Sequence, residues 1–205
     1  MAQLKVPMDA TRFQTGMTWK DYMAQMGDNR AKTEENYAKS ALTDDERKFF
    51  GGLQGVKYAI MTAENWCGDV VRNSPLISHV CDAIPGCELR VFFRDKNYDI
   101  ADSYLNNGYR SIPVVAFFDK DWNEIGHWIE RASAATAKAV QIRAKTVEAA
   151  AGKDKAAQDA AMAEMRKLTA AEYEQPGGPL WRAAVNEMKL ILETRLGLVA
   201  ADKRS

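Results

Sequence analysis

The chain contains 205 residues, of which 46% are hydrophobic and 27% charged, a composition that excludes disorder throughout and suffices for one domain with extensions. Its 28 basic residues balance 28 acidic ones, so no overall field attracts nucleic acid or an anionic membrane surface, and we expect neither as a partner. The apolar run at 112–118 is far shorter than the roughly 18 residues that span a bilayer, and the opening residues lack the apolar core of a secretory signal. We therefore expect a cytoplasmic protein.

Residues 1–53 are polar, rich in Met and charge, and contain three helix-start signals. Thr18, Asp28 and Thr43 each stand before a segment of helix-forming residues, and Glu46 follows Thr43 at the spacing of a capping box. We expect two or three short helices here, which together make an N-terminal helical extension over 1–53.

Residues 54–131 hold nearly all of the strand-like sequence. Four short runs rich in β-branched and aromatic residues lie at 56–63, 88–93, 113–119 and 123–130. Helical segments at 69–84 and 100–106 separate the first three runs, which predicts parallel strands joined by crossovers, whereas the turn at 119–123 suits a hairpin. We expect an α/β core whose sheet is mixed, parallel first and antiparallel at its end.

Residues 132–205 are dominated by Ala, Lys, Glu and Met and predict helix almost throughout, with breaks at Gly152 and at 175–179. Apolar residues recur at helical spacing on one face of each of the last two segments. They are Ala157, Ala161, Met165 and Leu168, then Leu180, Ala184, Met188 and Ile191. We expect this C-terminal helical extension to pack on the core, and the alternative is that it forms a homodimer contact.

The chemistry is expected at Cys67, where a predicted strand ends and a predicted helix begins. A thiol at this place lies near unpaired backbone N–H groups and the positive end of the helix dipole, both of which favour the thiolate. Gly68 leaves the sulfur open to a partner, and Trp66 could form one wall of the site. Ile112 and Pro113 open the third strand, where a cis bond would leave the preceding backbone free to pair with an extended substrate.

At this point the chain resembles the thioredoxin superfamily. The resemblance rests on the motif 66–69 (Trp-Cys-Gly-Asp) at a strand-to-helix turn, on Ile112-Pro113, and on the closing hairpin strand at 123–126, and it covers about residues 50–131. Together with Arg94 and its neighbours, the motif is similar to a bacterial branch of thioredoxin-like proteins that carries extra C-terminal helices. The resemblance implies a thioredoxin-like three-layer α/β fold with a mixed central sheet and helical extensions at both ends.

Two departures from the redox-active pattern of that family stand out. The position three after Cys67, where a resolving cysteine would stand, is Val70, and the place of the buried carboxylate six residues before the cysteine is held by Met61. Cys81 lies 14 residues on, roughly 21 Å along an unbroken helix, far beyond the ~7 Å that a disulfide allows. Cys81 and Cys87 could pair with each other, but we favour buried small hydrophobes.

Other side chains could assist the sulfur. Asp69 would cap the helix or accept a proton when a bound thiol is expelled, and Arg72 would lower the pKa of the thiol or hold a carboxylate of a small thiol such as glutathione. Arg110 and Ser111, with Tyr109, would line the rim of the same groove. A metal site is not expected, because no Cys-x-x-Cys pair exists and only two histidines, His79 and His127, are present.

Three functions remain open at this stage. The first is monothiol thiol–disulfide exchange, in which Cys67 attacks a low-molecular-weight or protein disulfide and an external thiol, with glutathione as one candidate co-substrate, resolves the product. The second is a binding or scaffold module without turnover. The third is a thiol-dependent reaction on a small electrophile. None of the three requires a bound cofactor.

Overall fold

A computed structural model describes residues 7–198 and divides the chain into two compact units. The first contains the residues up to Glu130 together with those from Val185 on, and the second is Arg131–Ala184. The N-terminal segment predicted as an extension thus shares a unit with the sheet, and the end of the C-terminal segment returns to it. Residues 1–6 and 199–205, which include the outer ends of both predicted extensions and part of the segment used to reject a signal sequence, lie outside the described residues.

The first unit contains a four-stranded sheet with the order β2-β1-β3-β4. The strands are β1 (Tyr58–Ala63), β2 (Glu88–Phe93), β3 (Val114–Phe118) and β4 (Glu124–Ile129). β1 pairs with β2 in parallel, while β1–β3 and β3–β4 are antiparallel. The mixed sheet is confirmed, with the correction that β3 reverses direction.

The reversal of β3 follows from the segment that precedes it. Where the sequence predicted a helix over 100–106, the structure has only η2 (Arg94–Lys96) and the single turn α6 (Tyr98–Ala101). A crossover to a parallel strand normally uses a helix that runs the length of the sheet. α6 is too short for that path, so the chain enters the sheet from the same end.

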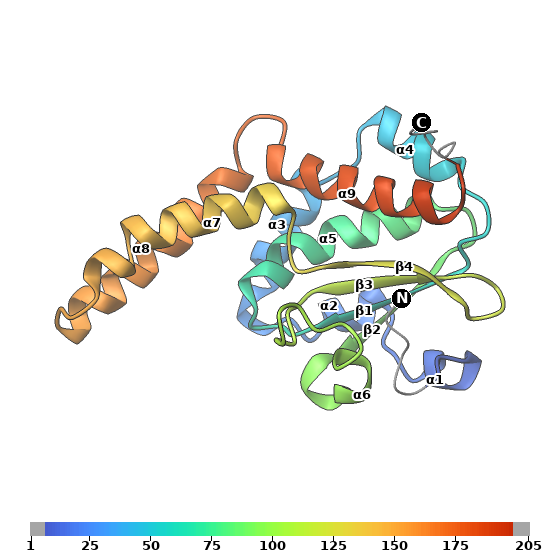
Figure 1. Ribbon diagram of the computed structural model, residues 1–205, viewed down its shortest axis with the longest axis horizontal. Coiled ribbons are helices and arrows are strands. Elements are labelled where there is room, and N and C mark those ends of the chain that lie inside the picture. Colours follow the sequence, from blue (N-terminus) through green and yellow to red (C-terminus); the bar gives the residue numbers. More distant parts are fainter. Residues whose placement is uncertain (1–6, 199–205) are drawn as a thin grey trace, which may run out of the picture. The chain divides into compact units, whose positions relative to one another are not determined.

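Helices flank both faces of the sheet (Figure 1). α5 (Gly68–Ala83) covers one face and contacts β1 and β2, and α3 packs on the outer side of α5. α1 and α6 lie on the opposite face. The remaining short elements of the first unit are α1 (Ala10–Gln14), α2 (Trp19–Met23), η1 (Gly27–Asn29), α3 (Arg30–Lys39) and α4 (Asp44–Gly51).

The core has two parts because side chains alternate across each strand. On the face covered by α1 and α6, one buried cluster combines strand residues with residues of the loops and short helices. Its members are Met8, Phe13, Ile60, Phe92, Ile100, Tyr104, Val114, Ala116 and Phe118. On the other face, Met61 and Val115 are fully buried, as are Leu76 and Ile77 of α5. α5 therefore carries the apolar surface that fixes it, and its first residue, against the sheet.

The helix starts of the N-terminal segment are only partly as predicted. Thr18 and Thr43 are N-caps, and Thr43 forms the capping box with Glu46. Asp28 is not an N-cap, because the chain first makes the 3₁₀ turn η1, and α3 begins after Asn29. The observed N-cap, Asn29, lies one residue after the predicted Asp28, and an Asx residue stands at both positions.

The N-terminal segment also adds a short bridge to the sheet. The backbone N–H of Met17 donates to the carbonyl oxygen of Val91 at 2.9 Å, and the N–H of Val91 donates to the carbonyl of Met17 at 2.8 Å. A side chain at Gly16 would lie 2.7 Å from the ring of Phe92, so the close approach requires glycine. This bridge covers the outer edge of β2.

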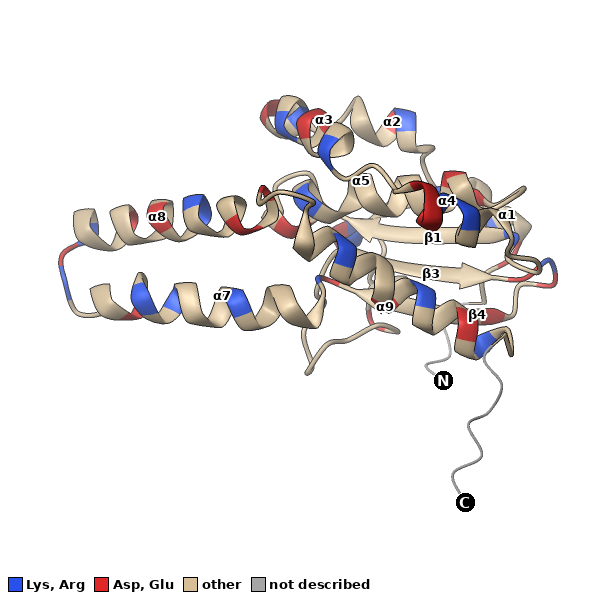
Figure 2. Cartoon of the chain, turned by 90° about the horizontal axis from the view of Figure 1, so that it is seen from above, with Lys and Arg blue, Asp and Glu red and all other residues tan. Residues whose placement is uncertain are grey.

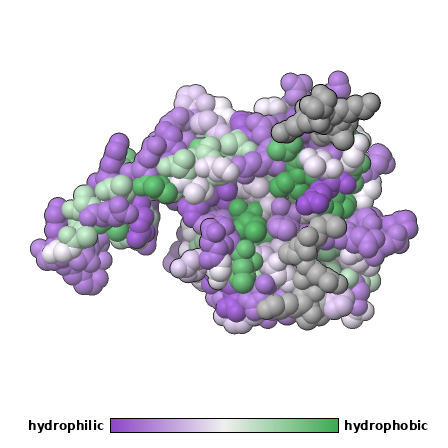
Figure 3. Space-filling view, viewed as in Figure 1, coloured by the Kyte–Doolittle hydropathy of each residue, from purple (hydrophilic) through white to green (hydrophobic). Residues whose placement is uncertain are grey.

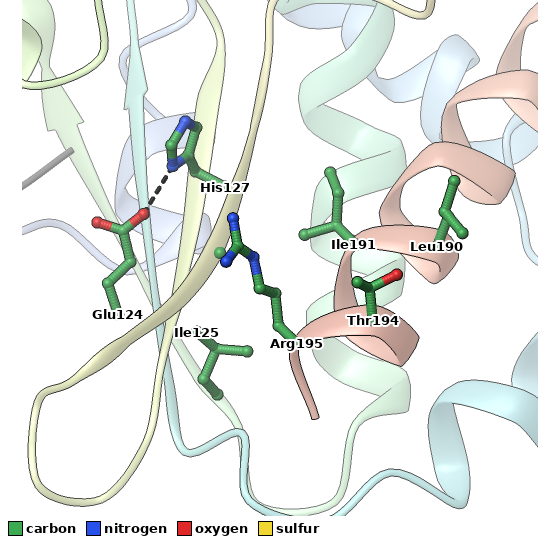
Figure 4. Close-up of a pocket in the computed structure, with 8 residues that line it drawn as sticks. Glu124, Ile125, His127, Leu190, Ile191, Thr194 and Arg195 are labelled. Carbon is green, nitrogen blue, oxygen red and sulfur yellow. Dashed lines mark hydrogen bonds and ion pairs between the residues drawn. The ribbon is translucent and has the colours of Figure 1, made fainter. Parts of the chain in front are cut away.

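α9 (Pro179–Arg195) packs its C-terminal half on β4. An added Cβ at Gly126 would lie 2.7 Å from Cγ2 of Ile191, and Nε1 of Trp128 donates a hydrogen bond to Glu187 at 2.8 Å. Figure 4 shows the residues that line a cavity of about 320 Å³ along this seam, where His127 bonds to Glu124. None of its lining residues is a cysteine, and the cavity is a gap in helix–strand packing.

The second unit is a helical hairpin. α7 (Ser133–Lys145) is followed by η3 (Glu148–Ala150) and then by α8 (Lys155–Tyr173), which runs back beside α7 (Figures 1 and 2). Tyr173 packs edge-on against Trp181 at the start of α9, with ring centroids 5.5 Å apart. Figure 3 shows hydrophilic residues interleaved with hydrophobic ones along this pair. Packing of this unit on the core and a homodimer contact both stay predictions.

Candidate functional site

Cys67 lies at the N-cap position of α5, directly after the loop that leaves β1. Its Sγ is half-buried and lies 3.7 Å from the carbonyl oxygen of Ile112, to which the thiol donates. The bond between Ile112 and Pro113 is cis. The expected strand-to-helix position of Cys67 is therefore observed, and residues 45 apart in sequence meet here. The helix begins one residue earlier than predicted, so Cys67 and not Asp69 occupies the cap.

The electrostatics of the sulfur differ from the expectation. The backbone N–H groups of Val70 and Asp69 do favour the thiolate, as a helix start should. Burial of the sulfur is the larger effect and raises the pKa of the Cys67 thiol above its ordinary value, and the carboxylates of Asp69 and Glu130 raise it further. The thiol form is thus favoured at neutral pH, whereas the sequence led us to expect a thiolate.

Asp69 and Arg72 form an ion pair one turn into α5, with 3.7 Å between Nη1 and Oδ1. The guanidinium folds back over Gly68, where an added Cβ would lie only 3.1 Å from Nη1. The structure therefore brings both predicted side chains beside the sulfur, with the carboxylate acting on its pKa and the arginine held by the carboxylate.

Trp66 forms an exposed wall next to Cys67, with 58% of its surface accessible. The guanidinium of Arg94 stacks on its ring at 5.1 Å, pairs with Asp95 at 2.9 Å, and donates to the carbonyl oxygen of Arg110 at 3.2 Å. Arg94 thus ties the loop that carries the cysteine to the loop that precedes Ile112.

A cavity of about 510 Å³ opens beside this wall. Residues of the loop after β2, of α6 and of the loop before β3 line it, and they are Arg94, Asp95, Tyr98, Asp102, Leu105, Gly108, Tyr109, Arg110 and Ser111. Arg110 pairs with Asp102 and its guanidinium stacks on Tyr98 at 4.3 Å. The predicted groove residues Arg110 and Ser111 lie at its rim, next to Ile112 and its contact with Cys67.

Glu64 lies behind the loop, directly before the cysteine motif, and the sequence predicted no role for it at the site. Only 7% of it is exposed, and its Oε1 accepts a hydrogen bond from the backbone N–H of Asp95 at 2.8 Å. Tyr22, from the N-terminal segment, is fully buried, and burial raises the pKa of its hydroxyl together with the nearby charges of Glu64 and Cys67. A charged residue directly after an apolar strand was the available signal for Glu64, whereas nothing local pointed to Tyr22.

The N-terminal segment also holds the loop itself in place. Nδ2 of Asn29 donates to the carbonyl oxygen of Asn65 at 2.8 Å, and Nδ2 of Asn65 donates to the carbonyl of Gln25 at 2.8 Å. These bonds fix the backbone directly before Trp66. The segment is therefore part of the site and not only an appendage to it.

The other two cysteines and both histidines lie away from the Cys67 site. Cys81 is fully buried within α5, and Cys87 lies beyond the end of this helix. His127 bonds to Glu124 at 2.6 Å, and His79 contacts the carbonyl oxygen of Tyr37 at 2.8 Å. No group of three or more candidate metal ligands gathers anywhere in residues 7–198, and no helix in this range is long and apolar enough to cross a membrane.

Comparison with known proteins gives one family. A family model described as thioredoxin matches residues 16–151. A solved protein of unknown function from Pseudomonas aeruginosa is similar with a TM-score of 0.63 and 16% identity, over 91% of this chain and 98% of that one. An HIV epitope scaffold reaches a TM-score of 0.57 and 16% identity, over 89% of this chain and 95% of its own. At this identity the likeness shows the fold alone, and no curated protein matches the chain.

Proposed function

The chain belongs to the thioredoxin family, and from this premise we propose that Cys67 carries out monothiol thiol–disulfide exchange. The thiolate of Cys67 attacks one sulfur of a disulfide, forms a mixed disulfide, and releases the other sulfur as a thiolate that takes up a proton. An external thiol then attacks the mixed disulfide and regenerates Cys67. The observation that carries the proposal is the half-buried Cys67 at the start of α5, with its Sγ 3.7 Å from the carbonyl oxygen of Ile112.

Resolution from outside is proposed because the chain offers no partner for Cys67. Val70 is buried at the third position after Cys67, and Cys81 is fully buried 14 residues along α5, roughly 21 Å away. A small thiol such as glutathione suits this role, which fits the cytoplasmic location that we propose for the protein. A protein disulfide is the alternative substrate.

The raised pKa of Cys67 sets the character of the exchange. Attack by Cys67 is slow at neutral pH and accelerates as the pH rises, because only the thiolate is nucleophilic. A thiol of high pKa is also a poor leaving group, so the mixed disulfide persists. We propose that Asp69 accepts the proton of the incoming thiol and that Arg72 positions this carboxylate, since the two side chains form an ion pair.

The experiment measures the rate of Cys67 alkylation as a function of pH, and the reaction with oxidised glutathione, on the full chain. Trypsin separates the cysteines, because Cys67 lies in peptide 58–72 and the other two lie together in peptide 73–90. We expect the alkylation rate to rise through a pKa above the ordinary ~8.5. A glutathione adduct should form on peptide 58–72 and be released by free thiol.

A binding module without turnover is the second candidate. Its support is the same raised pKa together with the exposed rings of Trp66 and Tyr109 near the cavity. It predicts that no adduct forms on peptide 58–72 at any pH at which the protein is folded. It also predicts that Cys67→Ser leaves partner binding intact, and this pair of results would reject the exchange reaction.

A further inference from the structure

A second pair of sulfur atoms lies at the other end of α5. The thiols of Cys81 and Cys87 lie close enough to interact with each other, and both are free. Neither takes part in the site described above. As expected, Cys81 is buried and the two residues form no disulfide, whereas Cys87 is only partly buried.

The end of α5 brings the two residues together. The helix ends at Ala83, and the N–H of Ile84 then donates to the carbonyl oxygen of Cys81 at 3.2 Å. The N–H of Cys87 donates to the carbonyl of Ile84 at 3.1 Å, and Gly86 takes a positive φ of 70° that lets the chain fold back. Two successive tight turns therefore return Cys87 to the side chain of Cys81 before β2 begins.

Hydrogen bonds with Lys57, the residue directly before β1, hold this turn in place. Nζ of Lys57 donates to the carbonyl oxygen of Gly86 at 2.9 Å, and the N–H of Glu88 donates to the carbonyl of Lys57 at 3.0 Å. These bonds lie on both sides of Cys87 in the sequence. The contact between the two sulfur atoms is consequently part of an ordered connection and not of a free loop.

The two thiols differ in access. Cys81 has no exposed surface, whereas Cys87 is partly exposed. The interaction with Cys87 and burial together raise the pKa of Cys81 well above its ordinary value. The helix C-terminus, whose dipole disfavours an anion, acts in the same direction. An oxidant in solution can therefore reach the thiol of Cys87, whereas the thiol of Cys81 is buried beneath it.

We infer that Cys81 and Cys87 form a dithiol redox site that a small disulfide oxidises to an intramolecular disulfide. The Cys87 thiolate attacks oxidised glutathione, which forms a mixed disulfide and releases one glutathione thiolate. The Cys81 sulfur then attacks Cys87 Sγ and expels the second glutathione as a thiolate, which takes up the proton that Cys81 loses. Two protein thiols are oxidised, and one oxidised glutathione is reduced to two thiols.

This site is independent of the exchange proposed for Cys67. The 14 residues between Cys67 and Cys81 span roughly 21 Å of helix, so neither sulfur can resolve the other. Figure 1 shows α5 as one continuous helix between the two places. One experiment can accordingly support or reject the proposal for Cys67 and the inference for Cys81 and Cys87 independently.

In the test, the full chain without substitutions is incubated with oxidised glutathione, and the reaction is quenched with acid. Free thiols are then blocked with N-ethylmaleimide in denaturant, and the protein is digested with trypsin. Peptide 73–90 contains both residues and no other cysteine. We expect it to lose two hydrogens, to take up no maleimide, and to regain two reactive thiols after reduction. Peptide 58–72 reports on Cys67 in the same sample.

Two variants serve as controls. Cys81→Ala should keep a stable glutathione adduct on Cys87, because the resolving sulfur is absent, and Cys87→Ala should leave Cys81 unmodified in the folded protein. A stable adduct on peptide 73–90 of the unmodified chain, or two free thiols there after prolonged oxidation, would overturn the inference. Because the decisive measurement uses the unmodified chain, it holds even where a variant does not fold.

Discussion

Replacement of Gly126 by alanine should separate α9 from β4. The added methyl carbon would lie 2.7 Å from Cγ2 of Ile191, whereas carbon atoms in good contact lie about 3.5–4.0 Å apart. The helix and strand must therefore move apart by roughly 1 Å. The hydrogen bond from Trp128 to Glu187 joins the same two elements and opposes this movement.

Overpacking of this kind lowers the free energy of unfolding by about 1–3 kcal/mol. Urea unfolding followed by tryptophan fluorescence should show a midpoint that falls by roughly 1 M at an unchanged slope, given slopes of about 1–3 kcal/mol/M. In Gly51→Ala, by contrast, the nearest atom to the new Cβ is the carbonyl oxygen of Ala83 at 3.8 Å, an ordinary contact in a helix. The same chemical change should there leave stability unchanged or raise it by about 0.5–1 kcal/mol.

A second substitution, at Ile191, tests whether the contact between the new methyl group at position 126 and Cγ2 of Ile191 causes the loss of stability. Ile191→Leu removes the methyl group at Cγ2 and nearly conserves the side-chain volume, so Gly126→Ala should cost less stability in that background. If Gly126→Ala is neutral, or if its cost is the same with leucine at 191, the packing argument for this seam is wrong. Figure 4 shows Ile191 directed from α9 toward β4, as the argument requires.

Three further predictions concern charge, pH and capping. Asp69→Asn removes one of the charges that raise the pKa of Cys67, so alkylation of Cys67 at pH 7 should become faster, and an unchanged or slower rate would contradict this. Because the folded pKa of Cys67 is raised, its contribution to stability is present below about pH 8.5 and is lost as the pH rises through the folded value. Cys67→Ser should therefore lose less free energy of unfolding at alkaline pH, as measured by urea unfolding. An equal loss in both proteins would count against this prediction. Thr43→Ala removes the capping box with Glu46 and should lower the free energy of unfolding by about 1 kcal/mol, whereas an unchanged melting temperature would show that the cap contributes nothing.

The sequence placed Cys67 correctly because its position depends on local signals, namely an apolar strand followed by a helix that starts at a glycine. It gave the wrong direction for the pKa of this thiol, since N–H groups at a helix start can be read from one segment, whereas burial depends on the whole fold. Tyr22 was missed for the same reason. Tyr22 lies 45 residues before Cys67, and only the packing of the N-terminal segment brings it to the site.

The direction of β3 was mispredicted on similar grounds. The segment at 100–106 contains residues that can form a helix, but the structure uses only one turn of it before Leu105 and Asn106 turn the chain toward Ile112. The contact between Cys81 and Cys87 likewise needed the geometry of the turn at Gly86, which a count of residues along a helix does not contain. Local pattern thus predicted the elements, and their pairing depended on connections that no single segment specifies.

The bridge between Met17 and Val91 makes the two borders of the sheet unequal. A strand at the border of a sheet presents unpaired N–H and C=O groups that can recruit a further chain. On the β2 side, Val91 already exchanges both of its outward hydrogen bonds with Met17, which interrupts any continuous ladder there. A peptide or a second molecule therefore cannot extend the sheet along β2 with an unbroken set of backbone hydrogen bonds.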